Sequence, residues 1–100
     1  MDMQKYRSEI DRIDQEMIAL LDERMRISEK IARVKEEAGR GIVDAVREKE
    51  HLDEIVRWSA PDMAYYNKLV FSLIMKTSAD HQRTVLGYDS ELVDTVMESL

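Results

Sequence analysis

The sequence predicts an all-α fold, a three-helix chain with a very long first helix and a short C-terminal tail helix. An apolar stripe repeats at helical spacing from Met3 to Val34 with no Gly or Pro to interrupt it. The whole chain holds only 3 Gly and 1 Pro in 100 residues, which leaves little turn chemistry for a sheet. A helix over this stripe is roughly 50 Å long at about 1.5 Å per residue. Because that length exceeds what one small globule covers, we expect a single domain, residues 1–100, in an intertwined homodimer.

The first helix is predicted from Asp2 to Glu37. Its apolar positions advance by three and four residues, as one face of a helix requires, with one gap at Arg24. Gly39 and Gly41 are expected to end it, because Gly adopts the left-handed conformation that follows many helices. The stripe consists of Met3, Tyr6, Ile10, Ile13, Met17, Leu20, Ile27, Ile31 and Val34.

The rest of the chain predicts two further helices and a tail. Asp44 can cap a helix that extends to Trp58. Pro61 suits the first turn of a third helix, which is expected to run to Val85 and to end at Gly87. The tail, residues 88–100, repeats the helical pattern from Asp89 and predicts a short closing helix. The expected inner face of the third helix consists of Tyr66, Leu69, Val70, Leu73 and Ile74.

The bulk composition excludes several classes of function. A formal net charge of -6 argues against a general nucleic-acid binder, which needs a basic surface. Cysteine is absent, and His51 and His81 lack neighbouring ligands, so we expect no metal site and interpret both histidines as surface residues. No apolar run is long enough to span a membrane, and the charged N-terminus lacks a signal core, so a cytoplasmic location is predicted.

Arg24 breaks the apolar pattern of the first helix. It occupies one heptad row with Met3, Ile10, Met17 and Ile31. A buried guanidinium is costly unless an anion meets it, so Arg24 either pairs with an acid across the bundle, extends outward, or binds an anionic ligand.

Lys35 and Arg7 relate to Arg24 in different ways. Lys35 lies eleven residues on and returns to within roughly 20° of the same face, with Ser28 between them, so the two cations can clasp a small ligand. Arg7 lies seventeen residues earlier, about 25 Å along the axis. It can join such a site only from an antiparallel partner chain.

Acidic and amide side chains mark the other two helices. Glu48 shares an inward face with apolar residues, which an ordinary helix pair between Asp44 and Arg47 does not explain. Ser78 and Gln82 end a stripe that begins with apolar residues. They belong either to a site or to a polar end that frays toward solvent.

Taken as an ordered set, these residues resemble the all-helical class of chorismate mutases. The resemblance covers roughly residues 3 to 83. It rests on the segments YRSEIDRID (6–14), LLDER (20–24), IARVK (31–35), DAVRE (44–48) and LIMKTS (73–78), with Gln82 four residues later. No single segment is specific, whereas the ordered set is.

The resemblance implies an isomerase of phenylalanine and tyrosine biosynthesis that rearranges chorismate to prephenate with no cofactor and no covalent intermediate. Arg24 and a partner-chain Arg7 are then expected to hold the two carboxylates of this small dianionic substrate, assisted by Ser78. Lys35 and Gln82 are expected to face the ether oxygen, where negative charge grows as the C–O bond breaks.

The resemblance also implies roles for three residues of the second helix and its cap. Glu48 is expected to accept the substrate hydroxyl, with Asp44 nearby at the start of the helix. Arg47 is expected to orient the acids and to add positive potential.

Two alternatives stay open from the sequence. An isochorismate pyruvate-lyase of the same fold also uses clamping Arg and Lys residues, although Glu48 suits the hydroxyl of chorismate. A non-catalytic helical dimerisation module explains the long first helix but not the convergence of Arg24, Lys35, Glu48 and Gln82.

Overall fold

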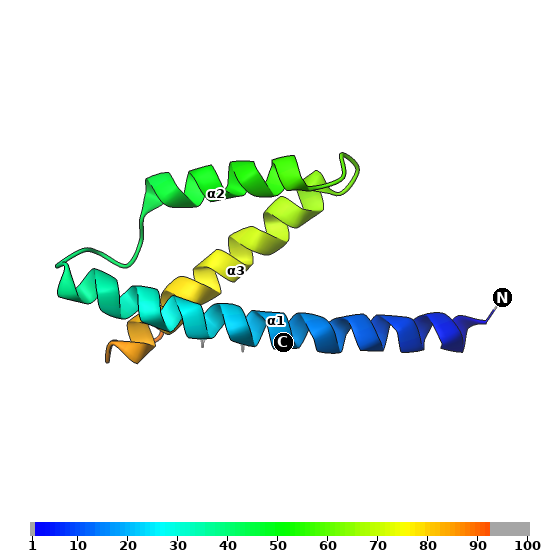
Figure 1. Cartoon of the computed structure of the whole chain (residues 1–100), viewed down its shortest axis with the longest axis horizontal. Coiled ribbons are helices and arrows are strands. Elements are labelled where there is room, and N and C mark those ends of the chain that lie inside the picture. The colour runs from blue at the N-terminus through cyan, green and yellow to red at the C-terminus, as the bar shows by residue number, and fades with distance from the viewer. Residues whose placement is uncertain (1, 93–100) are drawn as a thin grey trace.

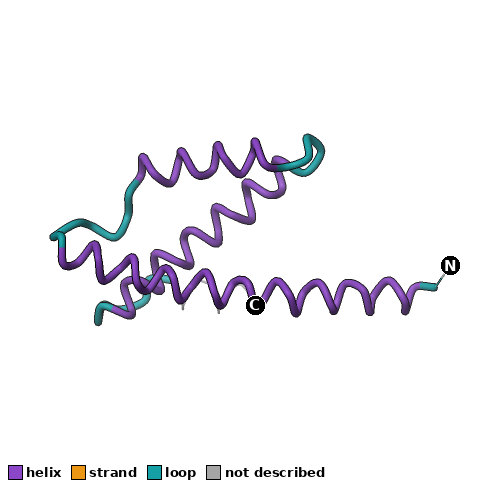
Figure 2. Tube along the Cα trace, in the orientation of Figure 1, coloured by secondary structure: helices purple, strands orange, loops and turns teal. Residues whose placement is uncertain are grey.

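A computed structural model describes residues 2–92 of the chain and shows an all-helical fold. Its elements are α1 (Met3–Glu37), α2 (Ala45–Trp58) and α3 (Ala64–Val85), with no strand among the described residues (Figures 1 and 2). This confirms the predicted three-helix order and the very long first helix. Most of the predicted tail helix lies outside the described residues, and its first residues, 89–92, are not helical.

The three helices are held together through α3. Both α1 and α2 pack against α3, while within residues 2–92 they do not pack against each other. Figure 1 shows α3 leaving the end of α2 and crossing the C-terminal half of α1, so that the N-terminal half of α1 projects beyond the other helices. The chain is accordingly elongated, with extents of 56 × 30 × 25 Å.

The helix ends follow the capping residues that the sequence supplies. Asp2 accepts a hydrogen bond from the backbone N–H of Lys5 at 3.1 Å and caps α1. Gly39 has φ +68°, and the next backbone N–H, of Arg40, donates to the Lys35 carbonyl at 2.8 Å. This is the left-handed ending predicted for α1, and it turns the chain toward α2.

The third helix begins three residues later than predicted. Pro61–Met63 forms a turn in which the backbone N–H of Met63 donates to the Ala60 carbonyl at 2.9 Å. The helix starts only at Ala64, so the prediction that Pro61 opens it was wrong. It ends at Val85 as expected, followed by Gly87 with φ +93°.

The core of the single chain is thin. Ala32 and Ile55 are the buried apolar residues among those described. The predicted inner face of α3 was wrong for four of its five members, which are 50% to 60% exposed, because α3 instead turns the stripe that contains Ser78 and Gln82 toward its neighbours. The exposed four are Tyr66, Leu69, Val70 and Leu73.

Among residues 2–92, no helix combines the length and apolar character needed to cross a membrane.

Candidate functional site

A cavity of about 530 Å³ lies between the C-terminal half of α1, the loop that follows it, the start of α2 and the C-terminal half of α3. Seven of the eight residues predicted from the sequence line this cavity, although they come from three helices and one loop. These seven are Arg24, Lys35, Asp44, Arg47, Glu48, Ser78 and Gln82. The eighth, Arg7, is exposed in the projecting part of α1 and does not line it.

Arg24 is half-buried and its guanidinium is oriented by α3. Its Nη1 donates to the hydroxyl oxygen of Ser78 at 2.7 Å, and Ser78 itself is buried. Among residues 2–92 no acid lies within ion-pair distance of Arg24, and the side chain does not extend outward. Both structural alternatives are therefore wrong. Burial lowers the pKa of Arg24 from its ordinary value, but an arginine stays charged in a protein. The guanidinium keeps unpaired N–H groups for an anion in the cavity.

Lys35 is held by the loop that ends α1. Its Nζ donates to the backbone carbonyl of Ile42 at 2.6 Å, and both residues line the cavity. An ammonium carries three donors, so one bond to the loop leaves two for a ligand. Since Gly39 sets the direction of this loop, the end of α1 also positions the ammonium.

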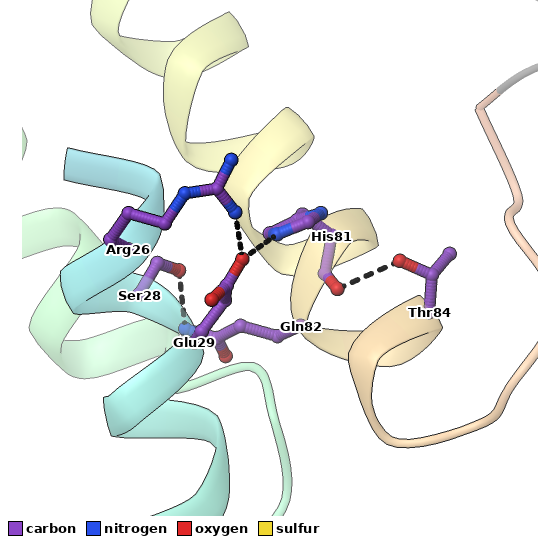
Figure 3. Close-up of polar contacts among 6 residues, drawn as sticks. All are labelled: Arg26, Ser28, Glu29, His81, Gln82 and Thr84. Atoms are coloured by element: carbon purple, nitrogen blue, oxygen red, sulfur yellow. Dashed lines mark hydrogen bonds and ion pairs between the residues drawn. The ribbon is translucent and has the colours of Figure 1, made fainter. Parts of the chain in front are cut away.

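Gln82 and Ser28 form the buried polar contact between α3 and α1. The Gln82 Nε2 donates to the Ser28 hydroxyl oxygen at 2.8 Å (Figure 3). Gln82 is 7% exposed and Ser28 5%, so the alternative that the polar end of the stripe frays toward solvent was wrong. The amide keeps a second N–H on Nε2, and its Oε1 has no partner within residues 2–92.

Asp44 and Glu48 differ in whether their carboxylates accept hydrogen bonds from the described residues. Asp44 caps α2 by accepting from the backbone N–H of Arg47 at 3.0 Å, and it receives a long contact from Arg40 at 3.5 Å. Glu48 is half-buried, and nothing within residues 2–92 bonds to its carboxylate. It is therefore a free acceptor on the cavity wall.

Arg47 lines the cavity, and its side chain is held by an ion pair on its own helix. Its Nη1 donates to Glu54 at 3.0 Å, so the acid that it holds in this structure is Glu54. Its contact with Asp44 is made by the backbone N–H. The ordinary side-chain pair of Asp44 with Arg47 is therefore not formed.

The two histidines are not simple surface residues, and that interpretation was wrong. His51 is half-buried and lines the cavity, because it follows Arg47 and Glu48 by one helical turn. His81 is half-buried against α1, where its Nε2 lies 2.8 Å from Glu29, which also pairs with Arg26 (Figure 3). No group of three or more His, Asp or Glu side chains that could hold a metal ion occurs in residues 2–92.

The rest of the cavity wall includes residues whose place in the site the sequence indicated weakly or not at all. Arg40 had a signal, because it lies between two Gly residues in a loop near Lys35. Ile42 and Ala79 had none, since a loop aliphatic and a small helical residue are common everywhere. The apolar lining consists of Ile27, Ile31, Ile42, Met75 and Ala79.

Comparison with known proteins agrees with the resemblance. The family model for chorismate mutase type II matches residues 6–83. The bifunctional chorismate mutase/prephenate dehydratase of Aquifex aeolicus (strain VF5) is 38% identical over 56 residues, which is 56% of this chain but only 16% of that protein. No solved structure matches the chain. The family match spans all of the residues that line the cavity, and the chain belongs to the chorismate mutase type II family.

Proposed function

We propose that this chain catalyses the rearrangement of chorismate to prephenate in phenylalanine and tyrosine biosynthesis. The observation that carries the proposal is the composition of one cavity of about 530 Å³. Four cationic side chains line it, together with the unpartnered carboxylate of Glu48 and the buried amide of Gln82. Such a wall suits a small molecule that carries two carboxylates and one hydroxyl. The four cations are Arg24, Lys35, Arg40 and Arg47.

The carboxylates of the substrate are assigned to arginines. Arg24 is oriented by Ser78 and has no acidic partner within residues 2–92, so a carboxylate can occupy its free N–H groups. The second carboxylate is assigned to Arg7 of the partner subunit. Holding both carboxylates keeps an extended molecule in its compact reactive conformer, which is the main entropic cost of the reaction.

The chemical step is a 3,3-sigmatropic rearrangement. The ether C–O bond breaks while a C–C bond forms, and no atom enters or leaves. Negative charge grows on the ether oxygen in the transition state. Lys35 and Gln82 are the proposed donors to that oxygen, because each retains free N–H groups in the cavity. Fixed donors of this kind favour the transition state over the substrate.

The substrate hydroxyl is assigned to the start of α2. Glu48 is the proposed acceptor, since its carboxylate has no competing partner within residues 2–92. Asp44 lies beside it at the helix N-terminus, and Arg47 supplies positive potential to this part of the wall.

A homodimer completes the proposed site. The apolar stripe on the projecting half of α1 is 40% to 64% exposed, far more than a monomer leaves uncovered along one face. Arg7 lies on the same projecting segment. An antiparallel second copy covers the stripe and brings Arg7 of the partner subunit toward the cavity. The stripe comprises Met3, Tyr6, Ile10, Ile13, Met17 and Leu20.

A single domain over residues 1–100, with residues 88–100 as a tail, and a cytoplasmic location remain predictions.

The test is a direct assay of purified protein. Loss of chorismate is followed by its ultraviolet absorbance and prephenate is identified as product. Isochorismate is assayed in parallel to separate the lyase. Turnover of chorismate to prephenate supports the proposal. Release of pyruvate from isochorismate alone would assign the lyase, and no turnover of either substrate would leave the non-catalytic dimerisation module.

A further inference from the structure

His51 is an ionisable side chain on the cavity wall that the proposed mechanism leaves without a role. Its ring packs edge-on against Trp58, with ring centroids 5.9 Å apart and planes at 79°. The Nδ1 is fully buried, and neither ring nitrogen has a hydrogen-bond partner within residues 2–92. A half-buried histidine without a hydrogen-bond partner at a cavity wall calls for an explanation.

Cations and carboxylates both surround His51. On its own helix it faces Arg47, Glu48 and Glu54, and on α1 it faces Arg24. Farther along the same wall are Lys35 on α1 and, in the loop, Arg40 and Asp44. The residues of α3 that line the cavity carry no ionisable group; they are Met75, Ser78, Ala79 and Gln82.

These surroundings favour a neutral ring in the empty cavity. Burial lowers the pKa of His51, Arg47 lowers it further, Glu54 raises it, and Arg24 lowers it again, with a net shift below the ordinary value. The imidazole is therefore uncharged near neutral pH while the cavity holds no anion.

Binding of a dianion shifts the protonation equilibrium of His51 toward the charged ring. Its carboxylates neutralise Arg24 and bring negative charge close to the ring, which favours the protonated form. We propose that His51 recognises the substrate by taking up a proton as the two carboxylates enter the cavity, and that it then acts as a further cation beside Arg24 and Arg47. This inference rests on the proposed function, because it requires a dianionic ligand. By linkage, a ligand that raises proton affinity must itself bind more tightly when protons are abundant.

The first test separates KM from kcat as a function of pH. In the unmodified enzyme, KM for chorismate should rise about three- to tenfold between about pH 6 and about pH 8, since protonated His51 is then lost. In His51→Gln and His51→Leu the KM should be nearly flat over this range. His81→Gln is the matched control, because His81 is the other of the two histidines and pairs with Glu29 outside the cavity. It should keep the pH dependence of the unmodified enzyme.

A second measurement needs no His51 variant. The imidazole signals of the two histidines are titrated by NMR with and without prephenate, and His81→Gln assigns them. The midpoint of His51 should move to higher pH when prephenate binds. A midpoint that stays in place, or a His51→Gln enzyme with the unmodified KM profile, would overturn the role of His51 while chorismate turnover persisted. An enzyme that neither turns over chorismate nor binds prephenate would instead overturn the proposed function.

Discussion

Gln82 is a buried amide on the face of α3 that packs against α1. It is 7% exposed, and one N–H of its Nε2 is satisfied by Ser28 at 2.8 Å. An amide does not titrate, so its donor is present at every pH. This property lets the residue donate to a developing oxyanion without protonation being required.

Replacing Gln82 by Glu should make catalysis depend on acid. The introduced carboxyl can donate to the ether oxygen only when protonated, and its carboxylate repels the developing charge. We expect kcat to fall by about a hundredfold as pH rises through the pKa of that carboxyl. The measurement is kcat at saturating chorismate, so that effects of His51 on binding do not enter.

Gln82→Met is the control for this experiment. Methionine has similar length and no donor, so its kcat should be low and independent of pH. An enzyme with Gln82→Glu that keeps the unmodified pH profile would remove Gln82 from the ether-oxygen role and leave Lys35 as the sole proposed donor.

At the scale of elements, the end of α1 links helix termination to the site. Gly39, at φ +68°, directs the loop whose Ile42 carbonyl holds the Lys35 ammonium. A Cβ at Gly39 would meet nothing within 4 Å, so any cost of adding one comes from the backbone conformation alone.

Gly39→Ala should lower the free energy of unfolding by about 1 kcal/mol, because alanine resists a left-handed conformation. Gly41→Ala is the matched control, since Gly41 lies two residues on, has open space around it and does not have a positive φ. Urea unfolding of both variants at equal protein concentration checks the difference. Equal stability of the two would contradict a left-handed ending for α1.

A second link between elements joins α1 to the end of α3. Glu29 lies between Arg26 and His81 in Figure 3, and the hydrogen bond with His81 is the main reason that the pKa of Glu29 is lowered. A carboxylate with a lowered folded-state pKa stabilises the fold above its unfolded-state pKa. It loses that contribution as pH falls through the folded-state value.

Glu29→Gln should therefore reduce the midpoint of thermal unfolding at neutral pH, and the difference from the unmodified protein should shrink in acid. Glu23→Gln provides the comparison, because Glu23 is an exposed residue of the same helix without an ion pair within residues 2–92. A deficit for Glu29→Gln that is independent of pH would show that packing, and not the carboxylate charge, is lost.

At the scale of the whole molecule, the single chain has a small described core and a cavity that its own Arg7 does not line. Its described core contains two buried apolar residues, Ala32 and Ile55. Arg7, on the projecting half of α1, is about 25 Å from Arg24 along the helix axis. In the proposed homodimer, a second copy covers the exposed apolar surface and supplies the guanidinium of its own Arg7.

Mixing two inactive variants tests this arrangement. Arg7→Ala and Arg24→Ala chains should each be nearly inactive alone, because each dimer then lacks one clamp in both sites. Under conditions where subunits exchange, the mixture should regain activity, since a heterodimer contains one site with neither substitution. The same samples are examined by light scattering, and an active monomer at micromolar concentration would sink the cross-chain assignment.

The sequence by itself predicted the three helices and their order, and it indicated a candidate site. The stripe from Met3 to Val34, the cap at Asp44 and the Gly residues after α1 and α3 set boundaries through local backbone preferences. The ordered polar residues on apolar faces indicated the site, because a charge at an inward position requires a partner or a ligand. These properties depend on spacing along one helix, which a sequence contains.

The tertiary structure decided what depends on how one helix meets another. Only the crossing of α3 over α1 shows that Ser78 reaches Arg24 and that Gln82 reaches Ser28, contacts between residues 54 positions apart. It also shows that Tyr66, Leu69, Val70 and Leu73 stay exposed, and that His51 lies on the cavity wall. Periodicity shows that a helix has an apolar face, but the crossing geometry determines which neighbour, if any, covers it.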